Sequence, residues 1–358
     1  MFSDRSSILI RSKKELLASA VVHLGLLKYV SKLQSNSLVI LAYHRIRPDT
    51  AGDEAMFDEG VLGPTQLSFD HQVKWLKENF DVVSEGEILE AIRGRSKYKH
   101  RCVAITFDDG YRDNYTLALP VLKGNSVPAI FFVCPGLIDS GRLGWWDLIS
   151  YLVKKSRKPF GTIDGKTLPL GPQASATIEM LQSWMKLRRS SETEKLIEKL
   201  SEACEVSLPD PELQASQFMT WQHIRDAAQG GVAIGSHTHT HPVLTTIDEG
   251  TQRREMRESK RVLEQRLGTR IRTIAYPVGR YGCFSAATMR IAHECGYEGA
   301  FSFRTGGNFQ ENASPYNIRR VAPTNALDPI FACSMTMPKM FTWSINSPPP
   351  EIAAAEGL

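Results

Sequence analysis

Two adjacent carboxylates, Asp108 and Asp109, closely follow a short apolar run over residues 102–105. The run is typical of a buried strand, and α/β folds place their chemistry at the carboxyl ends of parallel strands. Two carboxylates side by side repel each other, so a positive partner is needed to keep at least one of them ionised. His237 and His241 follow a second strand-like run further along the chain. A carboxylate with two imidazoles is a typical ligand set for a divalent transition metal, and the sequence therefore predicts a metal-dependent enzyme.

These motifs resemble those of the polysaccharide deacetylases, carbohydrate esterase family 4. Residues 106–111 (Thr-Phe-Asp-Asp-Gly-Tyr) are similar to the first motif of that family, and residues 237–242 (His-Thr-x-x-His-Pro) are similar to the second. Residues 275–279 (Ala-Tyr-Pro-Val-Gly) are similar to a variant of the third. The resemblance covers residues 38–323, apart from a long insertion. It implies an α/β fold, a distorted (β/α) barrel with fewer than eight strands and a helical insertion.

The resemblance also implies a role for each motif residue. Asp109, His237 and His241 are expected to hold one divalent metal ion, with Zn²⁺ as the expected ion, and to leave one position open for water. The spacing of the two histidines suits a strand end that leads into a helical turn. Asp108 is expected to act as the general base that removes a proton from the attacking water. The backbone N–H of Val278 is expected to stabilise the oxyanion.

The chain departs from the family pattern at two positions. The third motif commonly begins with an arginine that pairs with the catalytic carboxylate, and Ala275 stands there instead. Arg320, in a late strand, is predicted either to supply that guanidinium or to be a surface charge. The usual C-terminal Leu-x-His, which provides the general acid, is also missing, because no histidine follows His293. His44, at the end of the first strand, is the candidate replacement or a residue that lines the site, and a hydrogen-bonded core histidine is the alternative.

Substrate contacts are expected from residues that surround the motifs. Trp145, Trp146 and Asp147 open the insertion. Aromatic rings stack on sugars and an aspartate accepts sugar hydroxyls, but paired tryptophans are often core anchors, so only one ring is expected to face the substrate. His239, whose position varies in the family, is expected at the solvent or at the rim of the substrate site. The predicted substrate-binding residues are Tyr111, Trp146, Asp147, Tyr276 and Pro277.

Strand-like and helix-like segments alternate along most of the chain, as in a parallel sheet. One of the helices is predicted to begin at Ser68, which would cap it. The alternation stops over residues 137–218, where no comparable strand is expected, and a helical insertion over the barrel mouth is predicted. The predicted organisation is an N-terminal amphipathic helical segment (1–36), a catalytic domain that includes the insertion (37–330), and a C-terminal tail (331–358).

The N-terminal segment has basic residues before an apolar stretch over residues 16–27. No signal-peptide cleavage site follows, and the stretch is too short to span a bilayer. Two interpretations remain open for the apolar face of the expected helix, which either packs on the domain or makes a peripheral membrane contact. This face consists of Leu16, Ala20, Leu24 and Leu27, with Leu17 and Val21 beside them.

The bulk composition excludes one class of partner. A net charge of +4 is too small to predict nucleic-acid binding. The six cysteines are scattered without a Cys-x-x-Cys pair, which favours buried thiols in a reducing compartment. A cytoplasmic location, with association with the inner membrane as an option, is expected. The oligomeric state stays open.

The predicted function is metal-dependent hydrolysis of the N-acetyl group of an amino sugar. The expected partner is an acetylated amino-sugar glycan, whether a polysaccharide, an oligosaccharide or a lipid-linked precursor. One alternative is an O-acetyl esterase or a deformylase, because the same site attacks either acyl group. The other is a non-catalytic carbohydrate-binding protein with a degenerate site, which the missing acid histidine leaves open.

Overall fold

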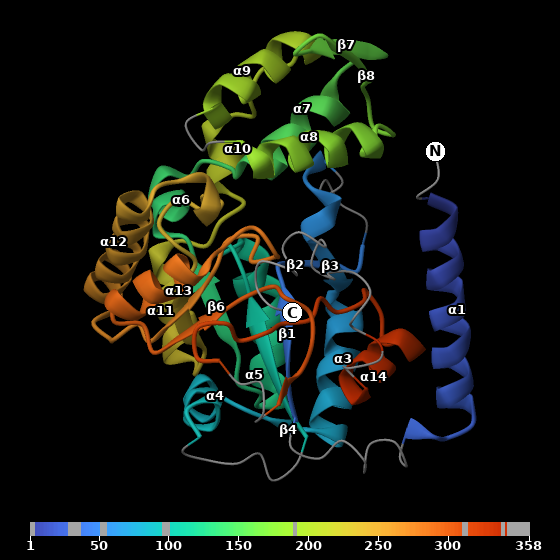
Figure 1. Cartoon of the computed structure of the whole chain (residues 1–358), viewed down its shortest axis with the longest axis vertical. Coiled ribbons are helices and arrows are strands. Elements are labelled where there is room, and N and C mark those ends of the chain that lie inside the picture. Colours follow the sequence, from blue (N-terminus) through green and yellow to red (C-terminus); the bar gives the residue numbers. More distant parts are fainter. Residues whose placement is uncertain are drawn as a thin grey trace.

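A curved sheet of parallel strands forms the centre of the computed structural model, which describes residues 4–27, 37–50, 56–94, 101–188, 192–309, 314–337 and 341 (Figure 1). The strands follow one another in space in the order β11-β10-β9-β6-β5-β1, and β4 pairs with the first residues of β5. A further strand, β12 (Asn308–Phe309), runs antiparallel along β1. The parallel strands are β1 (Ser37–Tyr43), β4 (Asp81–Val82), β5 (Cys102–Phe107), β6 (Ile130–Val133), β9 (Ala233–Ser236), β10 (Thr273–Ala275) and β11 (Gly299–Phe301).

Residues 318–321 connect the two edges of this sheet. Ile318 pairs with Phe301 of β11, and Val321 pairs with Leu41 of β1, both in parallel orientation. The sequence predicted a strand here, whereas the structure has only isolated backbone bridges. The described residues thus form a distorted barrel of seven regular parallel strands that an irregular segment closes, which confirms the predicted fold class.

Both faces of the strands are buried, as expected for a parallel sheet covered by helices. Along β1, Leu38 and Ile40 belong to a cluster inside the barrel, together with Phe132 of β6. Val39 and Leu41 alternate with them and belong to the larger cluster between the sheet and its helices. This alternation of side chains explains why the strand sequences read as continuous apolar runs.

Helices surround the barrel (Figure 1). Thr65, and not Ser68, caps the first helix that follows β1, because the Thr65 hydroxyl accepts the N–H of Ser68 at 3.3 Å. A π-helical segment, η3 (Asn114–Ala118), precedes α5. The surrounding helices are α3 (Gln66–Asn79), α4 (Glu85–Ile92), α5 (Leu119–Asn125), α6 (Pro135–Ser140), α11 (Trp221–Gln229), α12 (Glu249–Leu267), α13 (Ala286–Glu294) and α14 (Pro329–Thr336).

The short elements η2 (Glu59–Val61) and η5 (Leu244–Thr246) are turns of 3₁₀-helix. Two further short strands, β2 (Arg45–Arg47) and β3 (Leu62–Thr65), pair with each other just beyond β1. Helix α14 crosses the predicted domain boundary at residue 330, and the tail from residue 342 onward lies outside the described residues.

The insertion lies above the barrel at the top of Figure 1. It has a core of its own, in which Leu152, Leu181 and Leu200 are fully buried. The expectation that it lacks strands is wrong, because β7 and β8 form an antiparallel hairpin. Asp164 and Gly165 at its turn both have positive φ, as a two-residue hairpin turn requires. Its elements are α7 (Trp145–Lys155), β7 (Phe160–Ile163), β8 (Lys166–Pro169), α8 (Ser175–Leu187), α9 (Thr193–Cys204) and α10 (Pro211–Ala215).

The N-terminal helix α1 (Asp4–His23) packs against α14. Ala18 makes the buried contact, together with Cys333 and Met337. Val21 and Leu27 of the expected apolar face also pack there, whereas Leu16 and Leu24 are 71% and 70% exposed, so the helix packs on the domain with only part of that face. Among the described residues, no helix is both long and apolar enough to cross a bilayer. All six cysteines are described and buried, and none forms a disulfide, as predicted.

Candidate metal centre

The two carboxylates leave the barrel at the end of β5. The Asp108 N–H donates to the carbonyl of Tyr43 at 3.0 Å, which continues the pairing of β5 with β1. Asp109 and Gly110 then adopt φ of 72° and 83°. A positive φ is uncommon and costly outside glycine, and such strain is concentrated at functional sites. This tight turn lets two neighbouring carboxylates face different partners.

A second strained loop carries the histidines. His237 directly follows β9, and Thr238 and His241 have φ of 63° and 61°. The predicted helical turn between the histidines is therefore wrong. The Thr238 hydroxyl accepts the N–H of His241 at 3.2 Å. Glu255 of α12 accepts the two N–H groups between them, at 2.8 Å each, and so holds the loop against the barrel.

Asp109, His237 and His241 converge as predicted, and all three are buried. The Oδ1 atom of Asp109 lies 3.4 Å from the Nε2 atom of each histidine. These distances are too long for good hydrogen bonds, and this Oδ1 has no hydrogen-bond partner among the described residues. The Nδ1 atom of His237 is 2.8 Å from the carbonyl of Ala275, which favours the tautomer with a free Nε2 lone pair. A buried, unsatisfied carboxylate oxygen between two imidazoles fits a cation, and we call Asp109, His237 and His241 the metal cluster.

The charges at this cluster suit the same interpretation. Burial lowers the pKa of His241 to about 4, so its imidazole is neutral near pH 7, the form that binds metals. Burial disfavours the ionised form of Asp109, but the interactions with the nearby His237 and His241 imidazoles outweigh it and lower its pKa. Burial also disfavours charged His237, but the Asp108 and Asp109 carboxylates raise its pKa. A bound cation would take the place of the proton that His237 holds because of this raised pKa.

Asp108 forms its close contacts with Arg320, and its Oδ2 atom lies 3.9 Å from His237 Nε2. The guanidinium Nη1 and Nη2 atoms donate to the two carboxylate oxygens at 2.7 and 2.8 Å, and both residues are buried. Arg320 Nε donates to the carbonyl of Ser302 at 3.0 Å. Burial disfavours the Asp108 carboxylate, but the Arg320 charge outweighs this effect and lowers its pKa. The prediction that Arg320 supplies the guanidinium missing at Ala275 is confirmed as a contact, and the surface-charge alternative is wrong.

His44 lies on the other side of Asp108. Its Nε2 atom is 4.0 Å from Asp108 Oδ2, and its side chain is 25% exposed. His44 lines the cavity in front of the metal cluster, whereas a core histidine would be buried away from it. Asn114 donates to the His44 carbonyl at 2.6 Å and fixes the end of β1. His44 therefore faces the space in which a substrate of this site would lie.

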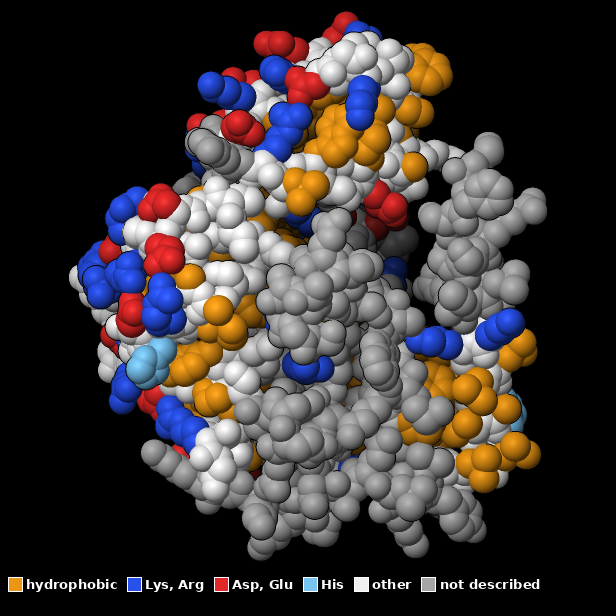
Figure 2. Space-filling model, in the orientation of Figure 1, with side chains coloured by type: hydrophobic (Ala, Val, Ile, Leu, Met, Phe, Trp, Pro, Cys, Tyr) orange, Lys and Arg blue, Asp and Glu red, His pale blue; other side chains and the backbone are white. Residues whose placement is uncertain are grey.

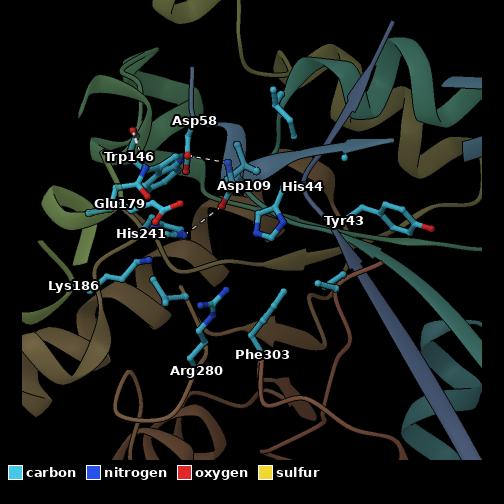
Figure 3. Close-up of a pocket in the computed structure, with 18 of the residues that line it drawn as sticks. Tyr43, His44, Asp58, Asp109, Trp146, Glu179, Lys186, His241, Arg280 and Phe303 are labelled. Carbon is cyan, nitrogen blue, oxygen red and sulfur yellow. Dashed lines mark hydrogen bonds and ion pairs between the residues drawn. The ribbon is translucent and has the colours of Figure 1, made fainter. Parts of the chain in front are cut away.

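A cavity of about 430 Å³ opens in front of these groups (Figure 3). Val278 lines it in a left-handed conformation (φ 60°), which is strained for a β-branched residue. Gly279 is required next to it, because a Cβ atom there would lie 2.7 Å from the Phe303 nitrogen. In the described part of the chain no hydrogen bond uses the Val278 N–H. This group is available for an oxygen atom in the cavity.

Trp146 lines the cavity, but Tyr111 and Asp147, which were also predicted to bind substrate, do not. The Trp146 ring packs on His241 with centroids 4.4 Å apart, and its Nε1 donates to the Tyr111 hydroxyl at 2.7 Å. That hydroxyl donates in turn to Asp147 at 2.7 Å. Tyr111 and Asp147 are fully buried, which corrects the expectation that they contact substrate. They fix Trp146 beside the metal cluster. Trp145 also lines the cavity, so both rings border it.

Two further expectations need correction. Tyr276 is fully buried, stacks on Phe284, and donates to the carbonyl of Tyr316 at 3.1 Å. Pro277 is also buried and does not line the cavity, so both residues support the Val278 turn from behind. His239 was expected at the solvent or at the substrate rim, and it lies in a separate surface cavity with Asp139 and Glu258, which agrees with the first of these positions.

Sequence reasoning missed several residues that line the cavity. Glu179, Gln182 and Lys186 come from one face of α8 in the insertion. Their spacing of three and four residues along an otherwise apolar helix was the available signal. Without the fold, nothing indicated that this face points at the metal cluster. Asp58, Arg280 and Phe303 are among the other lining residues that were missed.

A family model described as polysaccharide deacetylase matches residues 95–300, more than half of the chain. The match contains the predicted ligands and Asp108 but ends before Arg320.

Individual proteins show similarity of different extent. The Bacillus subtilis protein named "Putative polysaccharide deacetylase YxkH" is 23% identical over 285 residues, which cover 79% of this chain and 70% of that protein. The poly-beta-1,6-N-acetyl-D-glucosamine N-deacetylase of Escherichia coli K12 is 29% identical over 106 residues, which cover 29% of this chain and 15% of that protein. Among solved structures, the Streptococcus pyogenes deacetylase PplD in complex with acetate has a TM-score of 0.57 at 19% identity and covers 85% of this chain and 100% of its own. At that identity the likeness concerns the fold.

Proposed function

Because the chain belongs to the polysaccharide deacetylase family, hydrolases that act on carbon–nitrogen bonds, we propose that it removes the N-acetyl group from an amino sugar of a glycan with the help of one divalent ion. Zn²⁺ is the proposed ion, because an aspartate and two histidines suit it and leave a position for water. The observation that carries the proposal is the buried, unsatisfied Asp109 oxygen between two imidazoles, directly beside the paired Asp108.

The residues around the cavity supply the remaining steps. Asp109, His237 and His241 would hold the ion, which when bound would polarise the acyl group and make water more acidic. Asp108 takes a proton from the water that attacks the amide carbon, and Arg320 keeps this carboxylate ionised and oriented. The Val278 N–H donates to the carbonyl oxygen as negative charge develops on it.

His44 is the proposed general acid. It donates a proton to the amino nitrogen as the carbon–nitrogen bond breaks, so that the products are acetate and a free amino sugar. Its place in the cavity, 4.0 Å from Asp108, supports this role. A histidine from the end of β1 would then replace the one that the family usually takes from its C-terminal motif. His44→Gln should lose most turnover and keep the ion.

The proposal is tested by acetate release from N-acetylglucosamine oligomers and from acetylated xylan. Zinc-loaded protein should release acetate from the oligomers, a chelator should abolish the reaction, and added Zn²⁺ should restore it. Acetate from xylan alone would favour an O-acetyl esterase. Release from neither substrate, with one ion bound per chain, would favour a carbohydrate-binding protein. Full activity in chelator without a stoichiometric ion would refute the metal centre.

A further inference from the structure

Two positive side chains border the cavity of the metal cluster without an acidic partner. Lys186 comes from α8 of the insertion, and Arg280 comes from the loop after β10. No ion pair involves either residue within the described part of the chain. Their neighbours in the insertion differ, since Lys154 and Lys158 each pair with a glutamate. Two cationic side chains that share one cavity without an ion pair indicate a site for a negatively charged ligand.

The surroundings of Lys186 make the arrangement unfavourable without a ligand. Burial lowers the pKa of Lys186, and the charge of Arg280 lowers it further, so the ammonium group is partly dehydrated and close to a like charge. Asp58 acts in the opposite direction but is 8% exposed and accepts the N–H of Gly60 at 2.9 Å. An anion between the two cations would remove the repulsion.

In Figure 3, Lys186 and Arg280 both lie below His241 in that view, with Glu179 above Lys186 on the side of Trp146. The guanidinium carbon of Arg280 is 5.7 Å from the centre of the Phe303 ring, which orients it. The two cationic side chains therefore border the part of the cavity next to His241.

We propose that Lys186 and Arg280 form a subsite for an anionic substituent, a phosphate or a carboxylate, on the acetylated saccharide. This inference rests on the proposed deacetylation and narrows the substrate to acidic glycans or glycosyl phosphates. An arginine recognises either group through two parallel N–H donors, and a lysine adds a point charge. The insertion thus contributes to the choice of substrate, because it supplies Lys186.

The test compares three saccharides on the zinc-loaded protein. They are a neutral N-acetylglucosamine oligomer, the same oligomer as a glycosyl phosphate, and the same oligomer extended by a uronic acid. Acetate release gives kcat/KM, and calorimetry gives Kd without the need for turnover. The ratio of anionic to neutral substrate should exceed one and should fall with added salt. Lys186→Gln and Arg280→Gln should each lower this ratio by about tenfold, as expected for one charged hydrogen bond.

Two further variants make the comparison specific. Lys195→Gln removes an exposed lysine of α9 that does not line the cavity, and the ratio should stay as in the parent protein. Lys186→Glu should reverse the preference toward the neutral oligomer. If the two glutamine variants lower the ratio for the glycosyl phosphate alone, the preferred substrate is a glycosyl phosphate. If they lower it for the uronate alone, the preferred substrate is an acidic glycan.

The two proposals fail in different ways. Equal Kd ratios in the parent protein and both glutamine variants would overturn the anion subsite, even if the neutral oligomer is deacetylated. No acetate from any of the three saccharides would overturn the proposed function. In that case a Kd preference that depends on Lys186 and Arg280 would still support the subsite.

Discussion

Asp108 and Asp109 are neighbours in the chain, yet they face different partners. Asp109 turns to the two histidines, and Asp108 turns to Arg320. The positive φ of Asp109 allows this division, because it reverses the chain between the two side chains. Arg320 offsets the repulsion between the adjacent carboxylates on the Asp108 side, and His237 lies near both of them. This separation predicts that removal of Asp108 affects turnover, whereas removal of Asp109 affects ion binding.

Asp108→Asn should keep the ion and lose most turnover, whereas His237→Ala should lose both. The first change removes a proton acceptor and keeps the shape of the side chain, and the second removes a ligand. Metal analysis with kcat on the same preparations distinguishes the two effects. If Asp108→Asn kept near-native kcat, another group would have to be the base.

Arg320→Lys should lower kcat by about tenfold or more and leave the bound ion in place. Lysine keeps the positive charge but cannot donate to both Asp108 oxygens, so the base loses its orientation. Arg319→Lys is the matched control at the neighbouring position and should behave as the parent protein. Loss of the ion with unchanged turnover of the loaded fraction would instead make Arg320 a support of the metal ligands.

The buried carboxyl of Asp147 should make stability depend on pH. Burial raises its pKa to about 6, despite the Arg45 charge, the N–H of Asp58 and the Tyr111 hydroxyl. An acid whose pKa rises on folding stabilises the folded state at low pH and loses that contribution as pH increases through the folded value.

The free energy of unfolding should therefore fall by roughly 2–3 kcal/mol from this group between about pH 4 and pH 7. Asp147→Asn, which keeps the shape and does not titrate, should remove this part of the decline. Urea denaturation of both proteins at a series of pH values measures the difference. Parallel curves for the two proteins would show that Asp147 is ionised throughout.

The sequence predicted well which residues converge at the candidate metal centre, and it predicted the walls of the cavity poorly. Asp109, His237 and His241 lie in short local motifs that follow strands, so the ends of a parallel sheet bring them together. Tyr111 belongs to the same motif, but motif membership does not say which way a side chain points, and its hydroxyl turns to Asp147. Lys186 could not be assigned, because only the folded insertion brings α8 to the metal cluster.

Local signals also decided which elements could be predicted. The hairpin β7–β8 was missed although Asp164-Gly165 is a strong signal for a two-residue turn. Its flanking strands are short and half exposed, so they lack the apolar runs that revealed the barrel strands. Residues 318–321 were predicted as a strand because their ends are apolar. These ends are buried between β11 and β1, although their pairing is irregular.

Ile318→Ala should destabilise the protein by about 2–5 kcal/mol, because it removes a buried side chain from the interior of the barrel. It should also lower activity, since Arg320 lies in the same segment. Leu327→Ala, at a position that is 39% exposed, is the control and should change stability little. Urea unfolding gives both values. Equal stability of the two variants would mean that the segment contributes little to barrel closure.

The molecule as a whole carries one feature that catalysis does not use. Figure 2 shows hydrophobic side chains over the lower part of α1, next to basic ones. Leu16 and Leu24 are strongly exposed there, and Lys13 is exposed beside them. We propose that this face of α1 contacts an anionic lipid surface, because leucine side chains enter the acyl boundary while lysines meet the headgroups.

Leu16→Ser with Leu24→Ser should weaken binding to phosphatidylglycerol vesicles by roughly tenfold or more, as expected for the loss of two leucine contacts. The parent protein should sediment with these vesicles at low salt and less at high salt. Leu187→Ser, which changes an exposed leucine of the insertion, should leave binding unchanged. Equal sedimentation of the double variant and the parent would refute the contact.

We expect the segment over residues 318–321 to determine when a newly made chain becomes active. The three ligands leave the ribosome well before residue 318, so a growing chain can gather them while its barrel is still open. Asp108 receives its counterion only when the final segment docks between β11 and β1. We therefore expect an unfinished chain to hold the proposed ion but to lack an oriented base, so that hydrolysis begins only with barrel closure.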